Sequence, residues 1–191
     1  MLKFLEEEQI DPQVINGIKE FRKAYAPETE AAETPRYFYY GRNVWEQAAQ
    51  ALLAGENLLL AGAKATGKNV LAENLAAAFG RPVYNVSLHI NADAASMLGT
   101  DTFKNGEVTF RPGPVSEAAA GGGFCVLDEI NMARNEALAV LHSVLDFRRF
   151  VQIPGYKKIR IHGATRFIAT MNYGYAGTRE LNEALSSRFM I

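Results

Sequence analysis

One stretch decides the fold of this chain: Gly62-Ala63-Lys64-Ala65-Thr66-Gly67-Lys68-Asn69. It follows a short apolar run, residues 57–61, and precedes an alanine-rich segment, residues 68–79. A G-x-x-x-x-G-K-[ST] pattern between a buried strand and a helix is typical of a phosphate-binding loop. Only the final position departs from the pattern, because Asn69 stands where serine or threonine is usual. We therefore expect a strand, a phosphate loop and a helix in this order.

The spacing of the glycines and the lysine has a physical reason. In such a loop the backbone N–H groups turn inward around the β-phosphate, and the helix N-terminus adds positive potential. Glycine lets the backbone approach the anion closely, and Lys68 can bridge the β- and γ-phosphates. The side-chain oxygen of Asn69 is a hard, neutral donor that can bind Mg²⁺. The predicted nucleotide-binding residues are Gly62, Ala63, Lys64, Ala65, Thr66, Gly67, Lys68, Asn69 and Val70.

Two other interpretations of the loop stay open. The turn from strand to helix could hold no ligand, or the loop could bind a nucleotide without hydrolysing it. Asn69 motivates the second interpretation, and so does Ala65, which stands where related loops often have glycine.

A second apolar run, Phe124-Cys125-Val126-Leu127, ends in two acids, Asp128 and Glu129. Acids at the carboxyl end of a parallel strand lie where open α/β sheets bind ligands. We expect Asp128 to hold Mg²⁺ through water, and Glu129 to orient and deprotonate an attacking water molecule. The alternative for Asp128 is to cap the following helix. The predicted metal ligands are Asn69 and Asp128.

Two further polar residues complete the candidate site. Asn172 follows the apolar run at 166–170, and we expect it between the phosphate loop and Glu129, where it helps to hold the water. Its alternative is a turn residue before Gly174. Arg188 has a guanidinium, which suits the charge on a transferred phosphoryl group, and a neighbouring subunit can supply it; its alternative is an ordinary surface ion pair. The predicted catalytic residues are Lys68, Glu129, Asn172 and Arg188.

Strands and helices alternate after residue 37. Continuous apolar strands between helices indicate a parallel sheet covered on both faces, so the predicted fold class is α/β with three layers. The expected strands are 57–61, 82–88, 124–127 and 166–170, and the expected helices are 43–54, 68–79 and 135–147. Two hairpins interrupt the alternation, one over 104–111 with its turn at Asn105-Gly106 and one over 150–161 with its turn at Pro154-Gly155.

The N-terminal part is expected to be a separate segment. Residues 2–25 have apolar positions in a loosely helical pattern, and residues 26–36 are polar with two prolines, which indicates a linker. We therefore predict a helical segment and linker over 1–36 and a nucleotide-binding core over 37–191. The alternative is that the N-terminal helices simply pack against the core.

The bulk composition excludes several classes of protein. Lys plus Arg is 20 and Asp plus Glu is 21, which gives a formal net charge of -1 and argues against a dominant nucleic-acid surface. The second hairpin region is locally basic, so nucleic acid is possible but not favoured. The single cysteine, Cys125, fits a reducing compartment. The chain has neither a signal-peptide pattern nor an apolar run of about 20 residues, so we expect a cytoplasmic protein without membrane insertion.

Together these motifs resemble those of the AAA+ ATPases. The Walker A analogue is GAKATGKN at 62–69, Walker B is FCVLDE at 124–129, sensor 1 is Asn172, and the arginine finger is Arg188 in SSRF. Within that superfamily the chain looks most like the branch that holds the MoxR proteins, the dynein and midasin modules and the McrB restriction GTPase. The resemblance covers about Tyr37 to Ile191.

The two hairpins make the resemblance to this branch more specific. Met97-Leu98-Gly99-Thr100, the first hairpin and Gly113-Pro114 resemble the insert that this branch has in helix 2, and the second hairpin resembles its insert before sensor 1. The resemblance implies a P-loop NTPase core with sheet order 5-1-4-3-2. It also implies a homo-oligomer, commonly a hexameric ring, with nucleotide between neighbours. The chain departs from the pattern at Asn69, and it stops where the fifth strand begins, so we expect the helical lid to be absent.

The expected function is ATP binding and Mg²⁺-dependent ATP hydrolysis that drives remodelling of a protein partner, whose identity the sequence does not reveal. One alternative is a nucleotide-dependent binding module or switch with little turnover. Another is a nucleic-acid-coupled NTPase, and the choice between ATP and GTP stays open. The aromatic residues at 37–40 and Trp45 precede the first strand, where this superfamily often places the adenine. They either stack on a base or pack in the core.

Overall fold

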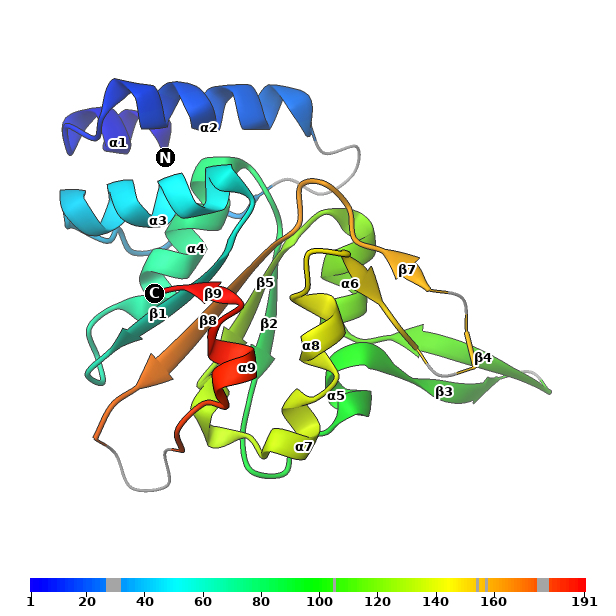
Figure 1. Ribbon diagram of the computed structural model, residues 1–191. Helices are drawn as coiled ribbons and strands as arrows, with labels where there is room; N and C mark the ends of the chain where they lie inside the picture. Colours follow the sequence, from blue (N-terminus) through cyan, green and yellow to red (C-terminus); the bar gives the residue numbers. More distant parts are fainter. Residues whose placement is uncertain (27–31, 105, 154, 157, 175–178) are drawn as a thin grey trace.

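A five-stranded parallel sheet forms the centre of the computed structural model, which describes residues 1–26, 32–104, 106–153, 155–156, 158–174 and 179–191 (Figure 1). The strands are β1 (Asn57–Gly62), β2 (Val83–Ser87), β5 (Phe124–Asp128), β8 (Arg166–Asn172) and β9 (Phe189–Met190). They lie in the order β2-β5-β8-β1-β9, and every neighbouring pair is parallel. Numbered along the chain within this sheet, the order is 5-1-4-3-2. The expected α/β fold and strand order are confirmed.

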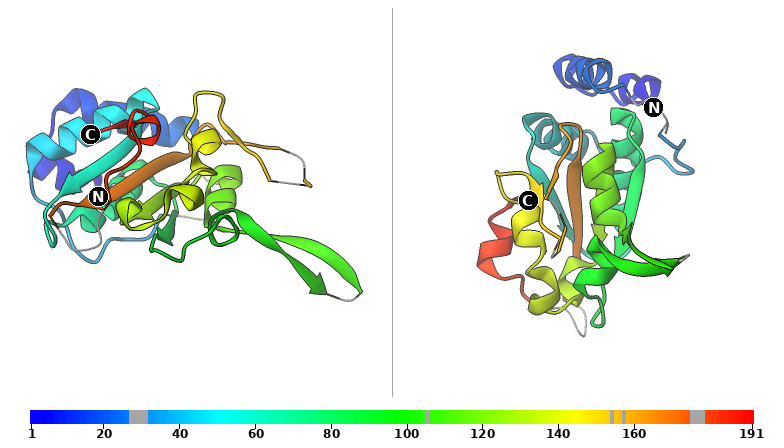
Figure 2. Two further views of the ribbon diagram at one scale, coloured as in Figure 1. Left: turned by 60° about the horizontal axis from the view of Figure 1, so that its bottom comes forward. Right: turned by 90° about the vertical axis from the view of Figure 1, so that its right-hand side faces the viewer.

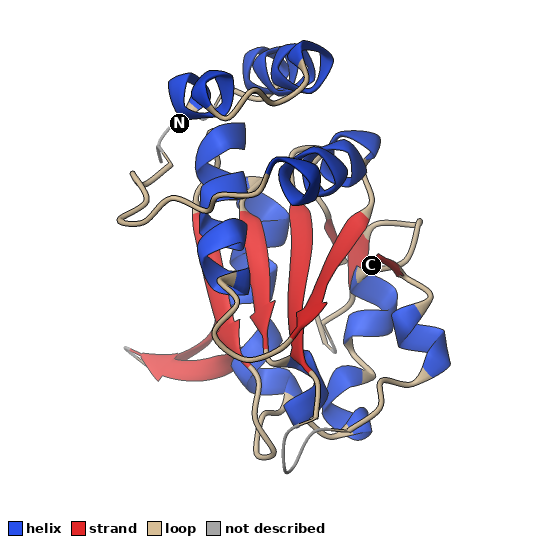
Figure 3. Cartoon of the chain, turned by 90° about the vertical axis from the view of Figure 1, so that its left-hand side faces the viewer, coloured by secondary structure: helices blue, strands red, loops and turns tan. Residues whose placement is uncertain are grey.

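Helices and loops bury both faces of the sheet, which gives three layers (Figure 3). Side chains alternate along each strand. On β5, Phe124 and Val126 belong to one buried cluster, whereas Cys125 and Leu127 belong to the other. The first cluster includes residues of α3 (Arg42–Ala54) and α4 (Lys68–Phe79), and the second includes residues of α5 (Ala94–Leu98), α6 (Pro114–Gly121), α7 (Asn135–Leu138) and α8 (Leu141–Val144).

The segment from β1 through α4 has the boundaries that its residues predict. Gly67 adopts φ 83° immediately before α4, and Gly80 adopts φ 70° immediately after it. A left-handed glycine is a common helix terminator, because it avoids the steric penalty of a Cβ and lets the chain turn away. Gly55 ends α3 in the same way, with φ 90°. These glycines therefore set where β1 begins and where the phosphate loop becomes a helix.

The N-terminal helices are α1 (Leu2–Glu7) and α2 (Pro12–Ala24); α2 packs on α3 and α4, and α1 packs on α2 (Figure 1). They share one buried cluster with α3 and α4, and the ring of Phe21 meets the ring of Phe79 edge-on, with centroids 4.9 Å apart. This favours direct packing on the core, while a domain division at residue 36 stays a prediction. Part of the predicted linker, 27–31, lies outside the described residues.

No helix in the described part of the chain is both long enough and apolar enough for a membrane span. The longest helices there are α2 and α3, with 13 residues each.

The helix expected over 135–147 is wrong, because the structure has two short helices there, α7 and α8. The N–H group of His142 donates to the carbonyl of Ala139, a three-residue spacing that tightens the chain between them. The Ser143 hydroxyl donates to the carbonyl of Val140 and so competes for a helical acceptor. The apolar side chains on which the expectation rested are nevertheless buried together, namely those of Leu138, Leu141 and Leu145.

Both expected hairpins are present, and the first is longer than predicted. β3 (Gly99–Lys104) and β4 (Glu107–Pro112) form an antiparallel ribbon that projects from the body between α5 and α6 (Figure 2). Gly99 has φ 120°, and a Cβ there would lie 2.3 Å from the carbonyl oxygen of Arg111, so the base of this ribbon requires glycine. β6 (Phe150–Val151) and β7 (Ile159–Arg160) form the second hairpin. Of the predicted turn residues, Asn105 and Pro154 lie outside the described residues.

Candidate functional site

The carboxyl ends of three neighbouring strands bring the predicted polar residues together. Gly62 at the end of β1 pairs in register with Asn172 at the end of β8. Leu127 pairs with Ala169, so Asp128 ends β5 at the same edge of the sheet. A cavity of about 250 Å³ opens here, lined by Lys64, Ala65, Thr66, Gly67, Lys68, Asn69, Val70, Asp128, Glu129, Thr170 and Asn172. Open α/β sheets bind their ligands at this edge.

The Lys68 ammonium lies inside the loop. Its Nζ donates to the carbonyl oxygens of Ala63 at 2.6 Å and Gly62 at 3.1 Å. Partial burial lowers the pKa of Lys68, while the charges of Asp128 and Glu129 act in the opposite direction. In this arrangement the loop carbonyls hold the cation in place, and an incoming anion would replace them as its partners.

The loop keeps an uncommon backbone conformation. Ala65 has φ 62°, a left-handed value that costs a residue with a Cβ about 1–2 kcal/mol. Gly67 has φ 83°, and a Cβ there would lie 3.2 Å from the ring of Tyr39. The Thr66 hydroxyl donates to the carbonyl of Ala63 at 3.0 Å, which ties the two sides of the loop together. Strain of this kind collects at ligand sites, because a fixed shape is useful there.

Thr170 links the two acids at the end of β5. Its hydroxyl donates to Oδ1 of Asp128 at 2.6 Å, and the hydroxyl oxygen of Thr170 accepts from the backbone N–H of Glu129 at 3.0 Å. Thr170 is buried, with 1% of its surface exposed. Glu129 has φ 56°, a left-handed value that a residue with a side chain seldom adopts. One buried hydroxyl therefore orients the Asp128 carboxylate and helps to hold Glu129 in an unusual conformation.

Two amides connect β5 to the end of β8. Nδ2 of Asn172 donates to Oε1 of Glu129 at 3.1 Å, as the expected place of Asn172 requires. Asn131 lies in η1 (Ile130–Met132), and its Nδ2 donates to the backbone carbonyl of Asn172 at 2.9 Å. The acid that is expected to activate water is thus fixed from the neighbouring strand.

The sequence motifs predict no role for Thr170 or Asn131. Thr170 is a hydroxyl residue in an otherwise apolar strand, two positions before Asn172, and Asn131 is an amide in the buried turn after Glu129. Both signals are visible in the sequence. Their meaning depends on the pairing of β5 with β8, which a single strand does not reveal.

The side chains at this edge fit a hard cation held together with a phosphate ligand. Asn69 and Asp128 line the same cavity, and both offer the oxygen atoms that Mg²⁺ prefers. Among the residues with described positions, no three His, Cys, Asp or Glu side chains cluster into a complete metal site. Mg²⁺ commonly takes its remaining ligands from water and substrate phosphates. The donor set therefore suits a nucleotide-bound Mg²⁺ rather than a permanent metal centre.

A larger cavity of about 830 Å³ adjoins the phosphate loop. It shares Thr66 and Lys68 with the smaller cavity, and Gly62, Tyr39 and apolar side chains of α3 and β1 also line it. Trp45 is fully buried, and its Nε1 donates to the carbonyl of Tyr39 at 2.9 Å. Core packing is therefore confirmed for Trp45, whereas Tyr39 is the aromatic residue that faces the cavity.

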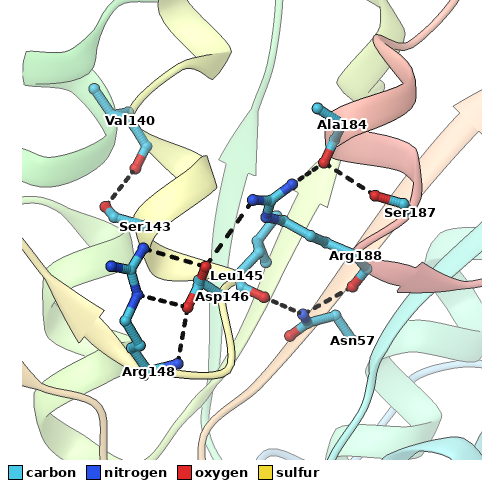
Figure 4. A network of polar contacts seen from close by, with 9 residues as sticks. All are labelled: Asn57, Val140, Ser143, Leu145, Asp146, Arg148, Ala184, Ser187 and Arg188. Atoms are coloured by element: carbon cyan, nitrogen blue, oxygen red, sulfur yellow. Dashed lines mark hydrogen bonds and ion pairs between the residues drawn. The ribbon is translucent and has the colours of Figure 1, made fainter.

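Arg188 lines a different cavity from the phosphate loop. Figure 4 shows its contacts with Ala184 and Asp146. Arg188 follows α9 (Glu183–Ser186), and its guanidinium donates to the carbonyl of Ala184 and lies 4.0 Å from the carboxylate of Asp146. Arg148 binds the same carboxylate at 2.9 Å, and these interactions lower the pKa of Asp146, with Arg148 as the main cause. The ion pair considered for Arg188 is thus present.

The family comparison matches most of the core. The sequence profile described as "AAA domain (dynein-related subfamily)" matches residues 57–189. The uncharacterized protein YojN of Bacillus subtilis is 42% identical over 146 residues, which cover 74% of this chain and 48% of YojN. The uncharacterized protein SH1500 of Staphylococcus haemolyticus is 38% identical over 163 residues, which cover 82% of this chain and 62% of SH1500. The chain thus spans about half to three fifths of the length of these relatives.

A solved structure shares the fold. The crystal structure of a "putative ATPase" from Cytophaga hutchinsonii matches with a TM-score of 0.65 and 20% sequence identity. The match covers 99% of this chain and 53% of that one. At this level of identity the likeness concerns the fold alone.

Proposed function

This chain belongs to the dynein-related subfamily of AAA domains, and from this premise we propose that it binds ATP with Mg²⁺ and hydrolyses it. One observation carries the proposal: Lys68, Asp128, Glu129 and Asn172 line a single cavity at the carboxyl edge of the sheet. Hydrolysis of a phosphoanhydride needs a loop that binds the phosphates, an acid that holds the metal and an acid that activates the water.

Each residue then has a defined task. Lys68 and the loop N–H groups from Lys64 to Val70 bind the phosphates. Asn69 and Asp128 would hold Mg²⁺, which would supply positive charge to neutralise the phosphates. Glu129 takes a proton from the water molecule while the oxygen of that water forms a bond to the γ-phosphorus. The bond from that phosphorus to the β–γ bridging oxygen breaks, and ADP leaves with this oxygen. Asn172 keeps the Glu129 carboxylate in position through their hydrogen bond.

We further propose that the protein works as a ring, commonly of six copies, that remodels a protein partner. Membership of the AAA family supports the ring, since nucleotide sites in this family lie between neighbouring subunits. Arg188 would then act on the nucleotide of the adjacent copy. This assignment agrees with the place of Arg188 in its own chain, where it lines a different cavity from the phosphate loop.

The base of the nucleotide would occupy the larger cavity beside the loop. This cavity adjoins the phosphate site and has Tyr39 for stacking and apolar side chains of α3 and β1 as walls. Such a lining accepts the face of a purine, and stacking on aromatic rings does not by itself discriminate adenine from guanine.

The test of the function is phosphate release at saturating ATP. We expect the full-length protein to release phosphate with Mg²⁺ and to stop when EDTA removes the metal. Release that is unaffected by EDTA, or no release with Mg²⁺, would contradict the proposal.

Asn69 favours a second candidate, a nucleotide-dependent switch with little turnover. The amide oxygen of asparagine is less favourably placed to bind Mg²⁺ than the hydroxyl oxygen of serine or threonine, because the asparagine side chain is longer by one atom. Under the main proposal Asn69→Thr changes the turnover rate less than tenfold. A gain of tenfold or more in phosphate release, at equal ATP affinity, would instead identify the natural protein as the switch.

Thr170 offers a prediction about the metal. Thr170→Val keeps the shape of the side chain but removes both hydrogen bonds to the acidic pair. Because residues that orient a metal ligand typically contribute about 10- to 100-fold to metal affinity or activity, we expect the Mg²⁺ concentration for half-maximal phosphate release to rise about tenfold. Thr170→Ser keeps the hydroxyl and should stay near wild type. Equal Mg²⁺ dependence in the valine variant and the wild type would disprove the role.

A further inference from the structure

Asn131 has an unmatched polar atom beside the candidate site. Its side chain is 97% buried, and its Oδ1 has no hydrogen-bond partner within the described part of the chain. The other half of the amide is well placed, because Nδ2 donates to the backbone carbonyl of Asn172. The backbone carbonyl of Asn131 accepts from the N–H of Arg179 at 3.0 Å. Asn131 therefore joins β5, the end of β8 and the segment that follows β8.

Stability alone does not account for an asparagine at this position. A buried acceptor without a donor destabilises the folded chain, and an apolar residue of the same size would avoid that loss. What only the amide supplies is a donor aimed at the carbonyl of Asn172.

The backbone explains how Asn131 reaches this place. Glu129 adopts the left-handed region, so the chain reverses directly after β5 and returns toward β8. The reversal puts Asn131 under the end of β8, whereas Glu129 itself faces the cavity. Asn131 does not line that cavity, so it would act through Asn172 and not on the nucleotide.

We propose that Asn131 is a positioning residue for hydrolysis: by holding the backbone of Asn172, it keeps the Asn172 amide on the Glu129 carboxylate. The inference rests on the proposed ATPase activity and extends it to a residue outside the cavity. The chain of contacts is short, since Nδ2 of Asn131 bonds to Asn172 at 2.9 Å and Nδ2 of Asn172 bonds to Glu129 at 3.1 Å. A shift of Asn172 would leave Glu129 free to turn away from the water.

The experiment compares two substitutions of similar size in the full-length protein. Asn131→Leu removes both polar atoms, and Asn131→Asp keeps an acceptor but loses the donor. We expect both variants to lower kcat for phosphate release about 10- to 100-fold, as for residues that orient an active group, with the KM for ATP within about twofold of wild type. The melting temperature of Asn131→Leu should stay within a few degrees of wild type, because removal of the unmatched Oδ1 offsets the lost hydrogen bond to the partly buried carbonyl of Asn172.

Three outcomes would overturn the inference. The first is a wild-type kcat in both variants. The second is an equal loss of kcat and ATP affinity, which would indicate a disturbed phosphate site. The third is an additive effect in combination with Asn172→Ala, because a residue that acts through the Asn172 side chain has nothing left to position in that background.

Two controls separate this inference from its premise. If the wild-type protein itself releases no phosphate, the proposed function fails before Asn131 is tested. Asp93→Ala removes the capping hydrogen bond to Ser96 at the start of α5, far along the chain from the site. It should lower the melting temperature without changing kcat, which shows that lost stability alone does not mimic the Asn131 effect.

Discussion

Glu129→Gln will bind ATP as the wild type does and will release phosphate about 10²- to 10⁴-fold more slowly, the usual contribution of a general base. The amide cannot take a proton from water. It still has an oxygen to accept the hydrogen bond from Nδ2 of Asn172, so the site should keep its geometry. The loss should therefore appear in kcat and not in binding.

The measurement pairs single-turnover phosphate release with equilibrium binding of a fluorescent ATP analogue. Glu136→Gln is the matched control, because Glu136 is an exposed glutamate in the first turn of α7. It should match wild type in both assays. Phosphate release at the wild-type rate in Glu129→Gln would exclude Glu129 from the mechanism and leave the proposed hydrolysis without a general base.

Lys68→Ala is expected to abolish nucleotide binding at ordinary concentrations. The ammonium can make two charge-assisted hydrogen bonds to the phosphates, each worth about 1.5–3 kcal/mol. A loss of about 3 kcal/mol corresponds to about a hundredfold higher Kd. The fold should persist, because the two carbonyls that the ammonium binds belong to the partly exposed Gly62 and the exposed Ala63, where water can replace it.

Isothermal titration with ATP and Mg²⁺ measures this effect. Lys19→Ala is the control lysine, since Lys19 lies on the surface in an ion pair with Glu6. Its removal should leave the Kd unchanged. A Kd for Lys68→Ala within threefold of wild type would show that the loop N–H groups alone hold the phosphates.

Much of the fold follows from local residue chemistry. The helix at 68–79 begins and ends where predicted, because Gly67 and Gly80 take left-handed conformations that other residues avoid. The helix expected at 135–147 is interrupted at Ala139 and Val140, where the N–H group of His142 donates to the carbonyl of Ala139. Apolar spacing predicted which residues are buried there, but it did not predict how the backbone hydrogen bonds are distributed.

The candidate site is predictable to the extent that its motifs are contiguous. The loop and the two acids lie in two short runs, and the strand order brings them to one edge. Thr170 and Asn131 contribute through contacts between β5 and β8, at separations of about 40 residues along the chain. For Arg188 the limit is different, since its expected ligand belongs to another copy and its contacts within this chain are those of a surface ion pair.

The network in Figure 4 has one more consequence, which concerns Asn57. The amide of Asn57 donates to the backbone carbonyls of Arg188 at 3.0 Å and Leu145 at 3.1 Å, and Asn57 is the first residue of β1. Gly62, the last residue of the same strand, opens the phosphate loop. A displacement of Arg188 therefore has a direct route to the phosphate loop of the same chain. That route is one extended strand of six residues, held at its first residue by the backbone of Arg188 and leading at its last into the loop.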